Sequence, residues 1–111
     1  YYACNYYYII IPMFIMLVEY EFGLPWEMED EYKKQSPATY VKNWKTPTLV
    51  IQGGKDFRVP ETEALGTFTA LQRQGIPSKF LYFPDENHWV LKPLNSIKWH
   101  NTIFAWLKEW I

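Results

Sequence analysis

The chain lacks the residues that several kinds of site and partner require. It has a single cysteine, Cys4, which excludes an internal disulfide and a cysteine-based zinc site and leaves the compartment unknown. Lys and Arg number 11 against 12 Asp and Glu, for a formal net charge of -1. Because neither sign of charge dominates, we expect neither nucleic acid nor a membrane surface as a partner.

A long uninterrupted hydrophobic run is also absent. The most apolar stretch, residues 1–18, is shorter than the roughly 20 residues that span a bilayer, and Pro12 interrupts it. It has neither the basic start nor the cleavage site of a signal peptide, and no helix or strand period. We leave it as an unassigned N-terminal segment, either a buried strand or the edge of a fragment. Because the chain begins at Tyr1 without a methionine, we expect a piece of a longer polypeptide.

Between residues 46 and 83 the patterns predict a strand, a helix and a second strand. The apolar run 49–51, bounded by Pro47 and two glycines, is typical of a strand buried on both faces of a parallel sheet. After Pro60, apolar residues recur at helical spacing until Gly75, which suits the end of a helix. The run SKFLYF, residues 78–83, predicts the second strand. Together they form a βαβ unit with parallel strands.

Further helices are predicted before and after this unit. Gly and Pro residues around a polar stretch indicate loops and a short helix near residues 27–34. After the second strand, Asn95 can cap a terminal helix. The apolar residues of that helix follow a helical spacing and must dock on the sheet: Trp99, Ile103, Trp106 and Trp110. This order of elements predicts an open α/β fold.

Two loops follow the carboxyl ends of the predicted strands, where functional side chains collect in such sheets. Asp56 lies five residues after Ile51, and His88 lies five residues after Phe83. Because parallel strands end at the same edge, we expect the two side chains to meet. An aspartate that accepts a bond from Nδ1 holds the imidazole in one tautomer and leaves Nε2 free to take a proton from a nucleophile. Acid, then histidine, is also the order of the α/β-hydrolase triad after its serine.

Simpler roles exist for the same residues. Asp56 follows Gly-Gly-Lys and suits a turn, and His88 suits a cap or the edge of a core. Asp85, Glu86 and His88 also have the composition of a metal cluster, but metal sites usually take ligands from several elements. We therefore expect Asp85 and Glu86 to shape the loop by binding backbone amides.

Three nearby side chains have structural explanations as well. We expect Arg58 to pair with a carboxylate and so hold the loop of the acid. Trp89 is expected to plug a pocket more readily than to line one. His100 is one residue away from the apolar stripe of the terminal helix, which predicts a surface or boundary residue.

Three stretches carry a resemblance to a known family: GGKDFRVP, LQRQGIPSKFLYFPDENHWVLKP and NSIKWHNTIFAWL. They closely resemble the C-terminal end of the catalytic domain in serine peptidases of the prolyl oligopeptidase family, nearest to its dipeptidyl-peptidase V and acylaminoacyl-peptidase branch. FGLPWE, residues 22–27, resembles a segment that this branch has between nucleophile and acid. The resemblance covers about residues 19–111, without residues 1–18.

The resemblance implies the C-terminal portion of an α/β-hydrolase fold, incomplete, over residues 19–111. It implies Asp56 as the acid and His88 as the general base of a catalytic triad. It also implies cleavage of short peptides, with removal of dipeptides or of a blocked residue from the N-terminus, without a metal or an organic cofactor.

One part of the triad is missing from these residues. The nucleophile of the family lies in a G-x-S-x-G turn, and Ser36, Ser78 and Ser96 are the only serines, none between paired glycines. Cys4 has no glycine neighbours either. We therefore expect the chain alone to be inactive, with Asp56 and His88 serving a serine from upstream sequence.

The expected partners follow from this interpretation: a short peptide substrate and the missing upstream part of the same domain. Two rival functions stay open. One is an esterase or lipase-like α/β-hydrolase, because the same triad on the same sheet cleaves esters. The other is a non-catalytic, truncated hydrolase module that only binds a partner.

Overall fold

The computed structural model describes residues 23, 24 and 26–111. The chain divides into two units, Tyr1–Trp44 and Lys45–Ile111, and each is described by itself. The predictions for residues 1–18, Cys4 included, concern positions outside the described residues.

The N-terminal unit contains an α-helix, α3 (Glu29–Gln35), and a 3₁₀ helix, η1 (Pro37–Asn43). Acidic residues in the first turn of α3 and lysines in its last turn complement the helix dipole. The short helix predicted near residues 27–34 is confirmed, shifted by one or two residues. The 3₁₀ helix η1 was not predicted. Pro37 is its first residue, and the hydroxyls of Thr39 and Tyr40 donate to backbone carbonyl oxygens of α3.

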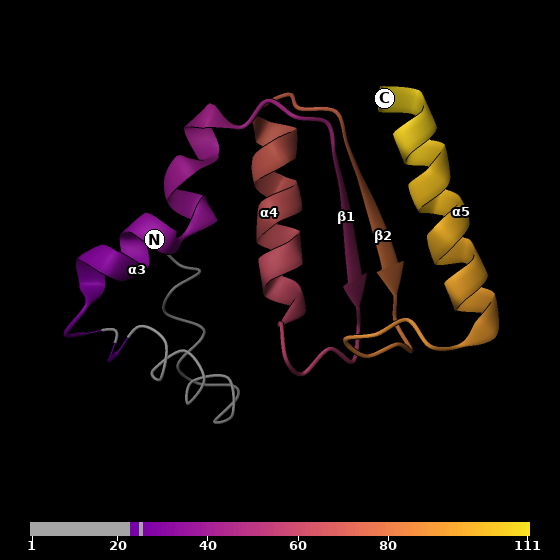
Figure 1. Cartoon of the computed structure of the whole chain (residues 1–111), viewed down its shortest axis with the longest axis horizontal. Helices are drawn as coiled ribbons and strands as arrows, with labels where there is room; N and C mark the ends of the chain where they lie inside the picture. The colour runs from indigo at the N-terminus through magenta and orange to yellow at the C-terminus, as the bar shows by residue number, and fades with distance from the viewer. Residues whose placement is uncertain (1–22, 25) are drawn as a thin grey trace. The chain divides into compact units, whose positions relative to one another are not determined.

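The C-terminal unit is built on the predicted βαβ arrangement. Strand β1 (Thr48–Gly53) and strand β2 (Ser78–Phe83) are parallel, in a register from Thr48 opposite Ser78 to Gly53 opposite Phe83. Helix α4 (Glu61–Arg73) connects them, and both strands end on the same side of the unit (Figure 1). Since β1 continues two residues beyond Ile51, Asp56 follows the end of the strand by three residues.

Helix α4 ends where glycine was predicted to end it. Gly75 has a positive φ of 69°, its amide donates to the carbonyl of Gln72 at 3.1 Å, and the amide of Ile76 donates to that of Leu71 at 3.0 Å. This pair of bonds satisfies the last carbonyls of the helix in a Schellman motif. Leu71 and Ile76 are both buried, so the same turn also closes the small core.

That core lies between α4 and the two strands. Besides Leu71 and Ile76, the core contains the buried residues Ala64 on α4 and Phe83 on β2. The ring centroids of Phe68 and Phe80 are 5.4 Å apart. By contrast, residues 49–51 of β1 are only half-buried, which corrects the expected burial on both faces. Within the described residues β1 has a strand neighbour on one edge alone, so less of its surface is covered.

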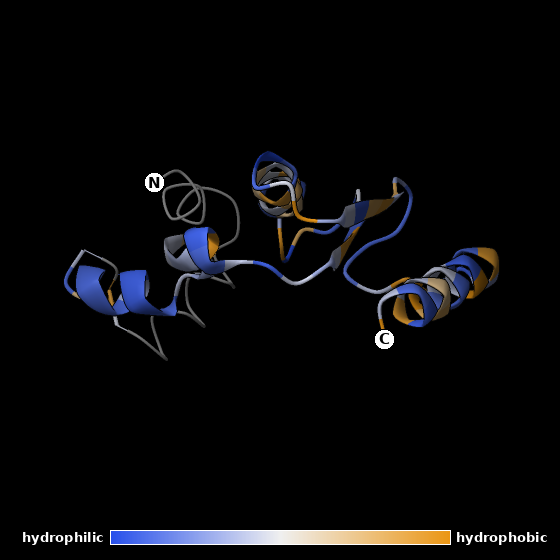
Figure 2. Cartoon of the chain, turned by 90° about the horizontal axis from the view of Figure 1, so that it is seen from above, coloured by the Kyte–Doolittle hydropathy of each residue, from blue (hydrophilic) through white to orange (hydrophobic). Residues whose placement is uncertain are grey.

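Helix α5 (Pro93–Trp110) lies on the other side of the strand pair from α4 (Figures 1 and 2). Asn95 does not cap it, contrary to prediction. Pro93 begins the helix earlier because its φ is preset for a first turn, and the side-chain amide of Asn95 instead donates to Asp85 and Glu86.

The predicted docking of α5 is only partly correct. Trp99, Ile103 and Trp106 are half-buried, but Trp110 is exposed. Figure 2 shows hydrophobic residues on both sides of this helix, so its apolar surface exceeds what the described sheet covers. No helix in the described part of the chain combines the length and apolar character that crossing a bilayer requires.

Candidate active site

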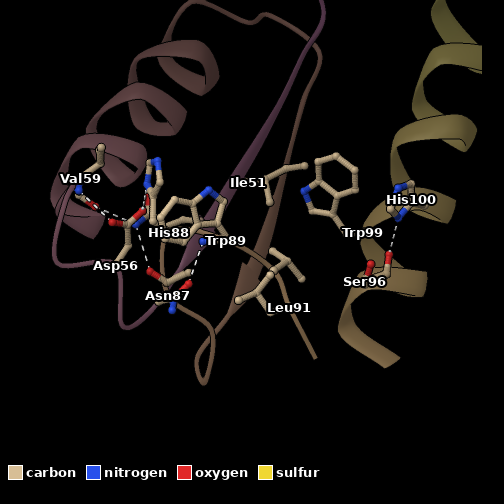
Figure 3. A pocket seen from close by; sticks show the side chains of 13 residues that line it. Ile51, Asp56, Val59, Asn87, His88, Trp89, Leu91, Ser96, Trp99 and His100 are labelled. Carbon is tan, nitrogen blue, oxygen red and sulfur yellow. Dashed lines mark hydrogen bonds and ion pairs between the residues drawn. The ribbon is translucent and has the colours of Figure 1, made fainter. Parts of the chain in front are cut away.

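The two predicted site residues meet at the carboxyl edge of the sheet. Asp56 lies in the loop after β1, and His88 lies in the loop after β2. His88 Nδ1 and Asp56 Oδ2 are 2.9 Å apart, and Figure 3 shows the two side chains pointing toward each other. The predicted meeting of these side chains across 32 positions is confirmed.

The carboxylate of Asp56 is buried and fully engaged. Its Oδ1 accepts the backbone N–H groups of Arg58 and Val59, each at 2.9 Å, and its side chain is 7% exposed. Burial alone would raise the pKa of Asp56, but the bonds from Val59, His88 and Arg58 together outweigh it and hold the pKa below its ordinary value. Asp56 is therefore both the turn residue of the simpler interpretation and an ionised acceptor for His88.

The ionised Asp56 determines what the imidazole of His88 can do. A carboxylate only accepts, so Nδ1 must carry the hydrogen that forms the bond. In the described part of the chain Nε2 has no hydrogen-bond partner, and the side chain is 38% exposed. The ring is thus held by one nitrogen and presents the other as a base to a group at the surface.

Two glycines at the end of β1 allow the loops to approach so closely. The amide of Gly54 donates to the carbonyl of Phe83 and the amide of Lys55 donates to that of Glu86, both at 2.8 Å. A Cβ added at Gly53 would lie 2.2 Å from the carbonyl oxygen of Asn87. Only glycine fits there, and the close approach aligns Asp56 with His88.

The acidic residues before His88 shape the loop, in two different ways. Glu86 is buried and accepts the backbone amides of Leu91 and Lys92, as predicted. Asp85 is exposed, and besides its own backbone amide its carboxylate bonds the side chains of Lys92 and Asn95. No group of three or more His, Cys, Asp or Glu among the described residues is arranged to hold a metal ion.

Arg58 and Trp89 connect the two loops at their outer surface. The guanidinium carbon of Arg58 lies 5.1 Å from the centre of the Trp89 ring, a cation–π contact. The predicted pairing of Arg58 with a carboxylate is wrong within the described residues, where its partner is the tryptophan face. Trp89 is 56% exposed and is one of the residues that line a cavity, whereas it was expected to plug one.

A cavity of about 470 Å³ separates the Asp56–His88 pair from α5. Figure 3 shows Asp56, His88 and Trp89 on one side of it and Trp99 and His100 on the other. His100 is exposed and its Nδ1 donates to the carbonyl of Ser96, one turn earlier, at 2.8 Å. This agrees with the boundary role predicted for it.

Sequence reasoning missed Gln52, which supports the loop of the acid from within β1. Its side chain is buried, and Nε2 donates to the carbonyls of Gly53 and Val59, each at 3.0 Å. These two carbonyls lie on either side of Asp56, so one amide group holds both ends of the turn. The available signal was a polar residue inside an otherwise apolar strand.

Comparison with known proteins places these loops in a family. Residues 5–111 match the model of the prolyl oligopeptidase family, including most of the segment 1–18 that we had left outside the resemblance. A dipeptidyl-peptidase 5 of Schizosaccharomyces pombe is 47% identical over 85 residues, which is 77% of this chain and 12% of that protein. One from Porphyromonas gingivalis is 50% identical over 76 residues, 68% of this chain and 11% of the relative.

A third relative extends the match further along the chain. A dipeptidyl-peptidase 5 of Trichophyton schoenleinii is 42% identical over 99 residues, 86% of this chain and 14% of that protein. The chain thus spans about an eighth of the length of the curated relatives that it matches. The predicted membership of an α/β-hydrolase family is confirmed, and the parallel strands with flanking helices agree with part of such a domain. From its strand order, its loops and this match over residues 5–111, the chain belongs to the prolyl oligopeptidase family.

Proposed function

We propose that these residues supply the acid and the general base of a serine peptidase that removes dipeptides from the N-terminus of short peptides. Asp56 is the acid, His88 is the base, and the nucleophilic serine comes from upstream residues of the same domain. The observation that carries the proposal is the 2.9 Å bond between a buried, ionised Asp56 and His88, in a chain whose relatives are named dipeptidyl-peptidase 5.

The proposed chemistry is acyl transfer in two steps. Nε2 of His88 takes the proton of the serine hydroxyl as its oxygen attacks the peptide carbonyl, and then gives that proton to the departing amine. Water, activated by the same nitrogen, releases the acyl group and regenerates the serine. Throughout, Asp56 keeps Nδ1 protonated and stabilises the imidazolium that forms. The reaction is proposed to need no metal or organic cofactor, and its partners are a peptide and the upstream part of the domain, not nucleic acid or a membrane.

Substitution of the pair tests the proposal in the longer polypeptide that contains this chain. We expect Asp56→Asn and His88→Ala to lower kcat for a dipeptidyl p-nitroanilide by about 10³–10⁴-fold. Asp30→Asn, which neutralises an exposed carboxylate of α3 outside the site, is the control and should leave kcat unchanged. Retained turnover in either of the first two variants would refute their assignment. Faster turnover of simple p-nitrophenyl esters than of dipeptidyl amides would favour the esterase instead.

The source of the nucleophile is tested with a serine-directed fluorophosphonate probe. The longer polypeptide should react with the probe at an upstream serine, and the 111-residue chain alone should not react. Failure of the longer polypeptide to react would favour the non-catalytic module. Labelling of Ser36, Ser78 or Ser96 in the chain alone would show that the nucleophile lies within these 111 residues and not upstream of them.

A further inference from the structure

Glu86 is a buried carboxylate that the proposed chemistry does not use. It lies two residues before His88 and is 4% exposed. Its Oε2 accepts the amide of Leu91 at 3.1 Å, and its Oε1 accepts the amide of Lys92 at 3.1 Å and Nδ2 of Asn95 at 2.7 Å. Burial would raise the pKa of Glu86, but these three donors outweigh it and lower the pKa. Charge-assisted bonds of this kind are among the stronger ones in proteins.

These bonds close the loop that carries His88. Because the side chain of Glu86 binds the amides of residues 91 and 92, it joins the first and last residues of the segment 86–92. His88 lies within that closed segment, and the side-chain oxygen of Asn87 accepts the amide of Trp89 at 2.8 Å. The imidazole is therefore attached to a short ring of chain whose shape depends on one carboxylate.

The main chain of Glu86 joins the same ring to the loop of the acid. Its carbonyl accepts the amide of Lys55, the residue before Asp56, at 2.8 Å, and its amide donates to Phe83 at the end of β2 at 3.2 Å. Glu86 thus contacts the acid loop through its backbone and the far end of the histidine loop through its side chain. A change in that side chain would move His88 relative to Asp56.

We propose that Glu86 is a positioning residue that sets the histidine loop so that His88 Nδ1 meets Asp56 Oδ2. Its effect on turnover rests on the proposed peptidase function, whereas its effect on the His88–Asp56 bond does not. Asp85 makes an instructive contrast: it has the same charge in the same loop, but it is exposed, and besides its own backbone amide its carboxylate bonds the side chains of Lys92 and Asn95.

Glu86→Ala, Glu86→Gln and the control Asp85→Asn, each in the longer polypeptide, test the proposal. Glutamine keeps one acceptor oxygen but turns an NH₂ group toward a backbone amide, so its effect should be intermediate. Two quantities are measured well below the unfolding temperature: the far-downfield proton resonance of the hydrogen-bonded His88 Nδ1, and kcat and KM for a dipeptidyl p-nitroanilide. Far-UV circular dichroism verifies folding, and the milder glutamine variant keeps the test available if the alanine variant unfolds.

We expect Glu86→Ala to abolish or strongly shift the Nδ1 resonance and to lower kcat on the order of 10²-fold with little change in KM, because a misplaced base affects the transition state more than substrate binding. Asp85→Asn should keep the resonance and change kcat less than about twofold. The proposal would be overturned if a folded Glu86→Ala variant kept the Nδ1 resonance unchanged. It would also be overturned if Asp85→Asn lost the resonance and kcat to the same extent as Glu86→Ala. Because the resonance does not depend on turnover, an inactive wild type would contradict the peptidase function alone.

Discussion

Asp56 and His88 share one hydrogen bond but lie in contrasting environments. The side chain of Asp56 is nearly enclosed, and its carboxylate accepts hydrogen bonds from Arg58, Val59 and His88, whereas the side chain of His88 is more than a third exposed. Such a division suits an acid that never changes its charge during a reaction and a base that must exchange protons with a substrate. Asp56 follows the end of its strand by three residues and His88 follows the end of its own by five.

The lowered pKa of Asp56 predicts a pH dependence of stability. Because the folded pKa lies below the unfolded value of about 4, the unfolded chain binds more protons between the two values. The stabilisation from Asp56 is therefore complete above the unfolded pKa and is lost as the pH falls through the folded pKa. The difference in unfolding midpoint between wild type and Asp56→Asn should be constant at neutral pH and narrow below about pH 4.

Thermal unfolding of the longer polypeptide from pH 7 to pH 3 measures this difference. Asp30→Asn, which removes an exposed carboxylate from the first turn of α3, serves as the control, and its difference from wild type should not exceed the small contribution of the helix dipole. If the difference in unfolding midpoint between wild type and Asp56→Asn stays constant down to pH 3, folding does not favour the ionised form of Asp56.

The ends of β1 and β2 act as one unit because two loops are joined there by backbone hydrogen bonds. Gly53→Ala would place its new Cβ 2.2 Å from the carbonyl oxygen of Asn87 and 2.7 Å from that of Glu86. Since both neighbours are backbone atoms, the histidine loop itself must move. We expect a loss of about 1–3 kcal/mol in the free energy of unfolding, together with a lower kcat.

Gly66→Ala is the matched control for this substitution. Gly66 lies within α4, and a Cβ there meets nothing within 4 Å, so alanine should stabilise the helix by about 0.5–1 kcal/mol. Urea denaturation of both variants measures the two free energies. Equal effects at the two positions would show that the close approach of the loops does not constrain residue 53.

The C-terminal unit as a whole leaves many large apolar side chains exposed beside a small core. Side chains of α5 and of the site edge are open to solvent, among them Leu94 at 82%, Phe104 at 63% and Phe57 at 75%. One edge of β1 also has no strand neighbour among the described residues. Exposed apolar faces and open strand edges promote association between chains.

We therefore expect the 111-residue chain, produced alone, to self-associate or to require the upstream part of the domain for solubility. Analytical ultracentrifugation and binding of a hydrophobic dye measure this, and coexpression with the upstream part should reduce both signals. Phe104→Glu, which places a charge on the exposed side of α5, should lower the association. A soluble monomer with a sharp cooperative melt would contradict the expectation.

The sequence predicted correctly the features that depend on neighbouring residues, and it predicted wrongly the side-chain partners of Asn95 and Arg58, which lie in another loop. Gly75 could be predicted to end α4 because a positive φ is a property of one residue and its helix. The capping role of Asn95 was wrong because Pro93 begins the helix two residues before it, and the side chain of Asn95 bonds Glu86 in the preceding loop. Arg58 met an aromatic face in place of a carboxylate because its partner belongs to another loop.

The residues by themselves determined the order of strand, helix and strand, and thereby that Asp56 and His88 share one edge of a sheet, because parallel strands joined by a helix must end together. Only the tertiary structure decided how that edge is assembled. The approach of Gly53 to Asn87 joins segments distant in sequence, whereas the three donors around Glu86 and the amide of Gln52 close the two loops over five to nine residues. Such contacts depend on the relative positions of loops in space, and these are fixed by packing and by hydrogen bonds that no local pattern encodes.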